Sequence, residues 1–227
     1  LIALNVEEEF PDMLCSVLLL DEEKKYLRIG AAPSLPDYYN EAVDGIEIGE
    51  GVGSCGTAAY SGERVVVEDI NTHPYWAAYT ALTQKANLGS CWSEPIKNAD
   101  GEVLGTFAIY HQEQTTPNKR DLILIEQFAH LASIAIERES ASKMIWQQAN
   151  FDSLTGLPNR NMMVEHLKKS IATALRDNSK VAVAFIDLDH FKDINDKLGH
   201  AVGDLLLVEV AHRILNSVRK NDTVARL

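Results

Sequence analysis

A long helical pattern, from about residue 118 to about residue 150, constrains the fold of this chain more than any other feature. Pro117 stops the segment before it, and Pro158 lies in the break that follows. The apolar spacing of four, three and four along its first half is that of a heptad seam. The seam residues are Leu124, Phe128, Leu131 and Ala135. We therefore expect two domains joined by one connecting helix.

The connecting helix exceeds the needs of one small domain, so we expect its outer part to pack against a second copy of the chain. The alternative is a terminal helix that covers its own sheet, and over the first three turns the spacing favours neither reading. Ile145 and Ala149 continue the seam weakly, while Arg138 and Ser142 interrupt it. An imperfect seam is compatible with a helix pair that has two arrangements.

The residues before the connecting helix predict an antiparallel sheet with a few helices. "MLCSVLLLDEEKKYLRIGAAP" predicts a hairpin with its turn at residues 21–25. "RVVVEDI" predicts another strand, and "SCWSEPIK" and "GEVLGTFAIYH" predict two more, joined by the turn "NADG". Helices are expected in "IGEGVGSCGTAAYSGE" and in "HPYWAAYTALTQKAN".

The residues after the connecting helix predict a second, α/β domain. "NRNMMVEHLKKSIATALRD" is amphipathic, "KVAVAFIDLD" predicts a buried strand, and "HFKDINDKLG" predicts a short helix. "HAVGDLLLVEVAHRILNSVR" predicts a longer helix, and a further strand is expected from Thr223.

Composition excludes several classes of protein. A net charge of −12 and a pI near 5.0 argue against a general nucleic-acid binder, because no basic stripe could neutralise a phosphate backbone. No apolar run approaches the ~18 residues of a membrane span, and the first residues lack the basic start of a signal peptide. We therefore expect a cytoplasmic location. The chain begins without Met, and we expect it to be a piece of a longer protein.

Two carboxylates close the apolar run "VAVAFI". Side chains alternate along a strand, so Asp187 and Asp189 share one face. Hard oxygen ligands of this kind suit Mg²⁺, which completes its shell with water and substrate phosphates. The alternative is that these are solvated acids at a strand end, or that Asp189 caps the helix that follows.

The following helices offer groups for a nucleotide. The Lys192 ammonium could bind phosphate, and Asn195 and Asp204 form a complementary pair for a base edge. A carboxylate accepts the two hydrogens of guanine N1 and N2, whereas the N1 acceptor of adenine would repel it. Alternatively, Asn195 is an ordinary helix-surface residue and Asp204 an acid stabilised by a helix dipole.

"DSLTGLPNR" and "DLDHFKDINDKLGHAVGDLLL" resemble the first two thirds of a GGDEF domain, the catalytic domain of diguanylate cyclases, over residues 151–227. The resemblance implies an incomplete palm-like α/β domain that takes Mg²⁺ or Mn²⁺ with GTP and forms cyclic di-GMP, each domain of a facing pair contributing one GTP. It also implies that Asp187 is catalytic and a metal ligand, and that Leu188 offers its main-chain carbonyl to the metal. The substrate-binding residues implied are Lys192, Asn195, His200 and Asp204.

The chain departs from that family where it stops, before the Gly-Gly-Asp/Glu-Glu-Phe signature expected after "RKNDTVARL". We therefore expect these 227 residues alone to be inactive as a cyclase. Arg219 and Asp222 form the R-x-x-D pair at the distance before the signature where the family has its product-inhibition site. The alternative is two surface residues in a loop.

"IGEGVGSCGTAAYSGERVVVEDINTHPYW" and "SCWSEPIKNADGEVLGTFAIYH" resemble a GAF domain over residues 1–140. That resemblance implies a six-stranded antiparallel sheet with flanking helices and an unknown small-molecule ligand over the sheet. Aromatic candidates for its pocket are Tyr75, Trp76, Tyr79 and Trp92, although aromatics at these spacings also suit a plain core.

Cys55 and Cys91 both follow the dipeptide "GS" and are candidates for a redox pair or a soft-metal site. "GVGSCG" also resembles a segment of the GAF-type free methionine sulfoxide reductases, but the spacing of the other cysteines departs from that family. The alternative is that both are small buried apolar residues.

The leading hypothesis is an α+β signalling protein in which a GAF domain senses a ligand and a helix over residues 118–150 controls a diguanylate cyclase in a homodimer. One alternative is a degenerate GGDEF domain that acts as a GTP or cyclic di-GMP receptor. Such a receptor could stand ahead of a phosphodiesterase domain in the longer protein. Another is a redox-sensing GAF binding module. Nucleic acid is not an expected partner.

Overall fold

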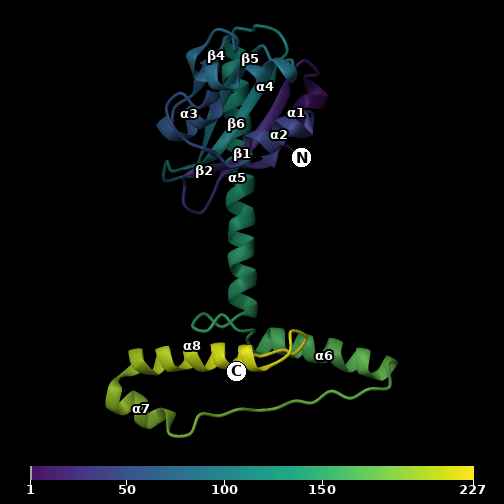
Figure 1. The fold of residues 1–227 in the computed structure, drawn as a ribbon, viewed down its shortest axis with the longest axis vertical. Coiled ribbons are helices and arrows are strands. Elements are labelled where there is room, and N and C mark those ends of the chain that lie inside the picture. The colour runs from purple at the N-terminus through teal and green to yellow at the C-terminus, as the bar shows by residue number, and fades with distance from the viewer. Residues whose placement is uncertain (1) are drawn as a thin grey trace. The chain divides into compact units, whose positions relative to one another are not determined.

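The computed structural model describes residues 2–227, so Leu1, the expected start of the first domain, lies outside the described residues. The chain forms two compact units, Leu1–Glu139 and Ser140–Leu227 (Figure 1). No helix among residues 2–227 is long and apolar enough to cross a membrane. The elements of the first unit are α1 (Ile2–Glu9), β1 (Leu14–Leu20), β2 (Tyr26–Ala31), α2 (Asp37–Val43), β3 (Ile46–Glu47), α3 (Gly53–Ser61), β4 (Val65–Val67), the 3₁₀ helix η1 (Pro74–Tyr79), α4 (Thr80–Lys85), β5 (Ser90–Lys97) and β6 (Val103–His111). After them come α5 (Lys119–Asn150), α6 (Arg160–Arg176), α7 (Phe191–Leu198) and α8 (His200–Ser217).

The first unit is built on the antiparallel six-stranded sheet that the sequence predicted, in the order β3-β2-β1-β6-β5-β4. The predicted β1–β2 hairpin is confirmed. Its turn is held by Asp21, whose Oδ1 accepts from the backbone N–H groups of Lys25 and Tyr26. The predicted β5–β6 pair is confirmed too, with Gly101 at the turn in the left-handed region at φ 83°.

Side chains alternate along the strands, so the sheet has two apolar faces. One face packs against α2, α3 and η1, with Cys91 and Tyr110 at its centre. The other packs against α1 and the first half of α5, with Trp92 and Phe107 at its centre (Figure 1). The helices α1 and α2 and the two-residue strand β3 were not predicted from the sequence.

A helix is present where the sequence predicted one: α5 begins at Lys119 and ends at Asn150. Its first half covers the sheet of its own unit through a face one position away from the predicted seam. The buried residues of that face are Ile125, Ala129, Ala132 and Ser133. Within the predicted seam, Phe128 still packs its ring against Phe107, with centroids 5.8 Å apart, whereas Leu131 is 49% exposed. The own-sheet alternative therefore holds for the early turns, and an apolar stripe beside it stays exposed.

The second unit has helices where the sequence predicted them. The segment "DSLTGLPNR" forms a tight corner between α5 and α6. The Asn159 side chain accepts from two backbone N–H groups at the start of α6 and donates to the Ala149 carbonyl near the end of α5. Asp152 Oδ1 accepts from Thr155 and from Arg226 Nη1 at 2.8 Å. The corner therefore joins the end of α5 firmly to α6.

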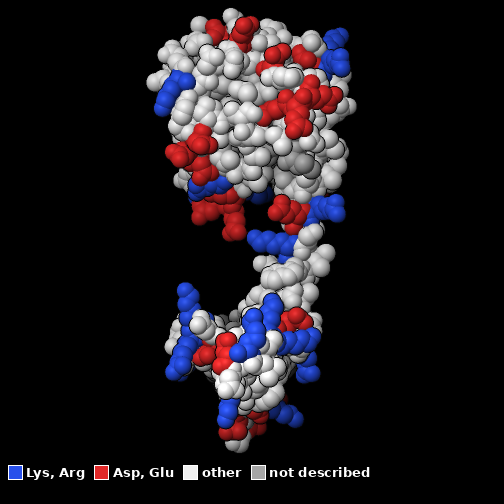
Figure 2. All heavy atoms as spheres, turned by 90° about the vertical axis from the view of Figure 1, so that its right-hand side faces the viewer, with Lys and Arg blue, Asp and Glu red and all other residues white. Residues whose placement is uncertain are grey.

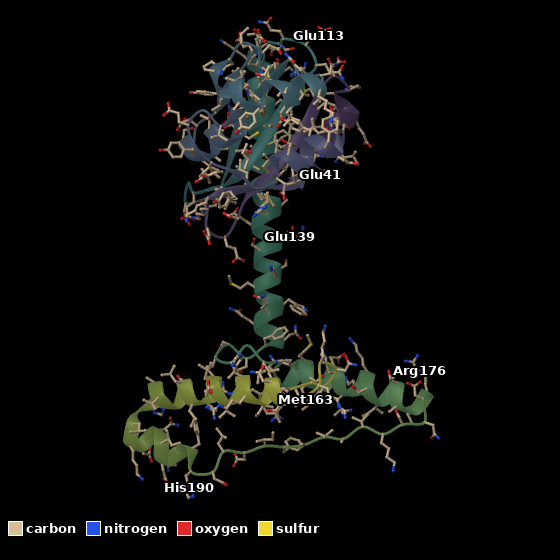
Figure 3. The ribbon with its side chains drawn as sticks, in the orientation of Figure 1. Glu41, Glu113, Glu139, Met163, Arg176 and His190 are labelled. Carbon is tan, nitrogen blue, oxygen red and sulfur yellow. The ribbon has the colours of Figure 1, made fainter. Side chains whose placement is uncertain are left out.

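The predicted buried strand over residues 180–189 is wrong. This segment has no regular structure, and Phe185 and Ile186 are 77% and 68% exposed (Figure 3, where the segment ends at the labelled His190). A strand needs neighbours for its backbone hydrogen bonds, and all named strands among the described residues lie between Leu14 and His111. The strand expected from Thr223 is absent for the same reason. The segment is apolar, as the sequence indicated, but no named strand among the described residues of the second unit lies beside it to pair with.

Candidate functional site

The first unit contains a cavity of about 30 Å³ between α3, η1 and the sheet. Trp76 and Tyr79 line it, as predicted candidates for a ligand pocket, together with Tyr39, Cys55 and Tyr110. The Trp76 Nε1 donates to Ser54 Oγ, which donates to the Cys91 carbonyl at 3.2 Å, so η1, α3 and β5 are joined beneath the cavity. A volume of this size accommodates one or two water-sized molecules.

Two other predicted pocket residues lie elsewhere. Trp92 follows Cys91 on β5, so alternation turns its ring to the opposite face, where its Nε1 donates to the Thr115 carbonyl at 3.2 Å. Tyr75 does not line the cavity and packs instead against His73, with ring centroids 4.6 Å apart. Of the four aromatic candidates, Trp76 and Tyr79 line the cavity, and Tyr75 and Trp92 do not.

Cys55 on α3 faces Cys91 on β5, and both are buried in the same core cluster. The Cys55 Sγ lies 3.6 Å from Tyr110 Oη. A hydrogen bond from Cys91 lowers the pKa of the Cys55 thiol to about 7 despite burial, which acts in the opposite direction. Burial instead raises the pKa of the Cys91 thiol well above its usual value. Cys55 therefore loses its proton at a lower pH than Cys91.

Sequence reasoning missed the hydroxyl groups that face this pair. Ser93 and Thr106 lie on the same face of the sheet as Cys91 and Tyr110 and help to lower the pKa of Cys55. The signal was available in the alternation of "CWS" and "TFAIY", which puts Cys91 with Ser93, and Thr106 with Tyr110. The sequence did not show the register of β5 against β6, which brings Ser93 and Thr106 to the same place.

In the second unit, the predicted guanine-binding residues gather where α7 meets α8. Asn195 on α7 lies against Gly203 on α8, and a methyl group at position 203 would overlap Asn195 Oδ1. Asp204 is the next residue and is exposed. Gly203 therefore allows the close approach that brings the amide of Asn195 to the residue beside Asp204. Chemically, this corner offers an amide and a carboxylate to one polar ligand.

Asp187 and Leu188, the predicted metal ligands, precede α7. The Asp187 side chain is exposed, and the Leu188 carbonyl accepts one hydrogen bond, from Phe191 N at 3.3 Å, which leaves its second lone pair free. Nowhere in residues 2–227 do three or more His, Cys, Asp or Glu side chains gather as a metal site. Mg²⁺ needs only one or two protein carboxylates, so the donors present fit that ion in kind.

The remaining candidates of the second unit are exposed. Lys192 is on α7, and His200 is the first residue of α8. Arg219 and Asp222 form a turn, in which Arg219 N donates to Asp222 Oδ2 and Asp222 N donates to the Arg219 carbonyl, both at 2.9 Å. Neither side chain is engaged in an ion pair within the described part of the chain.

Charge is distributed unequally between the units. Residues 1–139 contain 23 acidic and 9 basic residues, whereas residues 140–227 contain 10 and 12. Figure 2 shows more red groups than blue groups on the visible face of the first unit, and many blue groups on the second. An anionic ligand such as a triphosphate is therefore repelled less by the second unit than by the first.

Comparisons with known proteins agree with this division. Residues 2–137 match the GAF domain family, and residues 149–227 match the family of the diguanylate cyclase GGDEF domain. The GAF domain region of a protein from Geobacter sulfurreducens PCA superposes with a TM-score of 0.51 at 21% identity, covering 60% of this chain and 88% of that one. That likeness concerns the fold alone.

Two curated relatives each match well over half of this chain. The methyl sulfide methyltransferase-associated sensor of Methanosarcina acetivorans is 42% identical over 151 residues, which cover 66% of this chain and 15% of that protein. The diguanylate cyclase DgcP of Escherichia coli is 38% identical over 147 residues, which cover 61% of this chain and 43% of that protein. The chain thus matches less than half the length of either relative. It belongs to the GAF domain family, and a domain of the diguanylate cyclase GGDEF family follows its GAF domain.

Proposed function

We propose that the protein carrying this chain is a sensory diguanylate cyclase, in which the GAF domain controls the condensation of two GTP into cyclic di-GMP. The observation that carries the proposal is the α7–α8 corner, where Asn195 lies against Gly203, one residue before Asp204. A relative named as a diguanylate cyclase, which matches 61% of this chain, adds support.

Guanine recognition follows from the chemistry of that corner. The Asp204 carboxylate accepts from guanine N1–H and N2–H, and the Asn195 amide offers both a donor and an acceptor for the same base. Adenine presents an acceptor at N1, which a carboxylate repels. His200, at the start of α8, and the Lys192 ammonium bind the remainder of the nucleotide, Lys192 at the phosphates.

Asp187 and the Leu188 carbonyl are the residues that would hold Mg²⁺ or Mn²⁺. When bound, the ion neutralises charge on the triphosphate and favours attack of the ribose 3′-hydroxyl on the α-phosphate. Asp187 is exposed and so is open to a substrate-bound ion. Arg219 and Asp222, which are exposed and form no ion pair with another described residue, bind the product and inhibit the reaction.

The reaction needs two GGDEF domains face to face, so we propose that α5 pairs with α5 of a second copy. Apolar side chains are exposed along this helix on both sides of Glu139. They are Ile123, Leu131, Ile134, Met144, Ile145 and Trp146. Because the Asn159 corner ties the end of α5 to α6, a rotation of the helix pair would be passed on to the GGDEF domain.

Nucleotide binding tests the proposal directly. By calorimetry with Mg²⁺ present, GTP should bind residues 1–227 at least tenfold more tightly than ATP, and Asp204→Asn should remove most of that preference. Asp196→Asn is the matched control, because Asp196 is an exposed acid on α7 outside the corner. Equal binding of GTP and ATP, or equal effects of the two variants, would refute the assignment. Tight cyclic di-GMP binding without GTP binding would favour a receptor.

A further inference from the structure

The first unit contains a thiol pair that the proposed cyclase chemistry does not use. The Cys55 sulfur faces hydroxyl groups from both β5 and β6, those of Ser93, Thr106 and Tyr110. The hydroxyls of Ser93 and Thr106 are fully buried and make no hydrogen bond among the described residues. Both nevertheless lie close enough to the Cys55 sulfur to lower its pKa. A buried hydroxyl without a hydrogen-bond partner destabilises the fold, and a nearby group that becomes negative would supply that partner. We therefore assign Ser93 and Thr106 the role of facing such a group.

Tyr110 adds a directed donor to this group. Its Oη lies 3.6 Å from Cys55 Sγ and 3.3 Å from Ser16 Oγ. Burial raises the pKa of Tyr110 well above its usual value, so its phenol keeps its proton. A Cys55 thiolate has no proton to give, so Tyr110 would donate to it and accept from Ser16. Burial likewise raises the pKa of Tyr39, the titratable neighbour from α2, which therefore stays neutral.

The position of Cys55 favours the thiolate as well. It is the third residue of α3, within the first turn, where the backbone N–H groups and the helix dipole stabilise negative charge. Cys91, on β5, lies outside any helix, and burial raises the pKa of its thiol. One sulfur is thus prepared as a nucleophile, and its neighbour keeps its proton.

Access to this sulfur is limited by size. Cys55 is 7% exposed and borders the cavity of about 30 Å³. A cavity of this volume admits a molecule about as large as water and excludes bulky disulfides. The oxidant that fits is therefore small and neutral, and hydrogen peroxide is the smallest of the peroxides.

We infer that Cys55 and Cys91 form a peroxide-reactive dithiol, in which Cys55 attacks hydrogen peroxide and Cys91 then closes a disulfide between α3 and β5. In the first step the Cys55 thiolate forms a bond to one peroxide oxygen, the O–O bond breaks, and the leaving hydroxide takes up a proton to become water. In the second step the Cys91 sulfur displaces the hydroxyl of the Cys55 sulfenic acid as a second water. Two thiols lose two electrons, and one peroxide becomes two waters.

The disulfide would act on the connecting helix. Its sulfurs lie about 2.0 Å apart, closer than two thiols in contact, so it draws the start of α3 towards β5. Beyond the C-terminal end of α3, Arg64 forms ion pairs with Glu94 on β5 and, at 3.2 Å, with Glu126 on α5. A shift of α3 therefore reaches α5 through one guanidinium group. The inference does not rest on the nucleotide chemistry of residues 140–227.

Peroxide titration with peptide mapping tests the inference on residues 1–227. Stoichiometric hydrogen peroxide should remove two of the three thiols, produce one Cys55–Cys91 bond and leave Cys15 reduced. The bulkier tert-butyl hydroperoxide should react at least tenfold more slowly. Cys91→Ser should stop at the Cys55 sulfenic acid, which dimedone traps, and Cys15→Ser should behave like the unchanged protein.

Thr106→Val keeps the shape of the side chain and removes one facing hydroxyl, so it should slow sulfenic acid formation several-fold without unfolding the domain. Oxidation of all three cysteines at one rate would overturn the inference. A Cys55 that stays reduced while added glutathione is oxidised would overturn it too, as would a bond that includes Cys15.

Discussion

The two units of this chain contain similar apolar runs, but only the first unit buries its run. On β6, "TFAIYH" is buried throughout, and the Phe107 side chain is fully buried beneath α5. In the second unit, "VAVAFI" is exposed, with Phe185 77% exposed. The difference lies in the neighbours: β6 pairs with β1 and β5, whereas residues 181–186 pair with no strand among the described residues. Apolar composition predicts that a segment tends to be buried. Whether the segment is buried depends on a neighbouring strand with which it can pair.

The largest expected effect separates these two phenylalanines. Phe107→Ala should lower the free energy of unfolding of the first unit by about 3–5 kcal/mol, because it leaves a cavity against Phe128. Phe185→Ala should change stability by less than about 0.5 kcal/mol, as expected for an exposed side chain. Urea unfolding followed by the fluorescence of Trp76 and Trp92 reports on the first unit. If the two variants cost the same, the contrast between the units is wrong.

A second test asks whether the α7–α8 corner is packed despite the exposed run before it. Alanine normally stabilises a helix interior relative to glycine by about 1 kcal/mol. Gly203→Ala should instead destabilise the corner by about 1–3 kcal/mol, because its methyl overlaps Asn195. Amide hydrogen exchange over residues 191–217 should show the loss of protection. Adding Asn195→Ala should restore it, and a Gly203→Ala variant with increased protection would contradict the packing.

The third test concerns the attachment of α5 to the first unit. Arg64→Ala removes the ion pairs with Glu94 and Glu126 and should cost about 1–2 kcal/mol, since the group is partly buried. Lys24→Ala is the control, because its ion pair with Glu102 is more than half exposed on both sides and should contribute little. Urea unfolding should rank the two variants in that order. The reverse order would exclude Arg64 as the link between α3 and α5.

The smallest effect is a pH dependence of the corner in the second unit. Burial raises the pKa of Asp152, but hydrogen bonds from Thr155 and Arg226 outweigh it, so the pKa is lowered overall. The unfolded value is about 3.9, so the stabilisation is complete above that pH and is lost as the pH falls through the lower folded pKa. Exchange of the Thr155 amide between pH 5 and 2 should show this loss. Asp152→Asn should remove the pH dependence, and an unchanged profile would exclude Asp152 as its origin.

The sequence predicted those elements whose signals are local. The charged break at residues 21–25 marked the β1–β2 hairpin, and the apolar spacing marked α5. It missed α1, because only Ala3 and Val6 are buried in a helix that ends in three glutamates. It missed α2 and β3, which are seven and two residues long, because short elements give weak periodic signals.

What depends on distant pairing could not be predicted. The strand over residues 180–189 was expected from its composition, yet a strand exists only with a neighbour. The hydroxyls of Ser93 and Thr106 face Cys55 only because of the β5–β6 register and the position of α3 above it. The meeting of Asn195 and Gly203 likewise depends on the angle between α7 and α8, which no local pattern specifies.

The central claim, that this protein is a diguanylate cyclase under the control of a GAF domain, is tested most directly by turnover. Cyclic di-GMP formed from GTP should be measured with Mg²⁺ for the protein that carries residues 1–227, unchanged and with Asp187→Asn or Asp196→Asn. The account predicts product from the unchanged protein and from Asp196→Asn, and at least a hundredfold less from Asp187→Asn, which removes the proposed metal ligand. Equal turnover by all three proteins, or tight GTP binding without product from any of them, would contradict it.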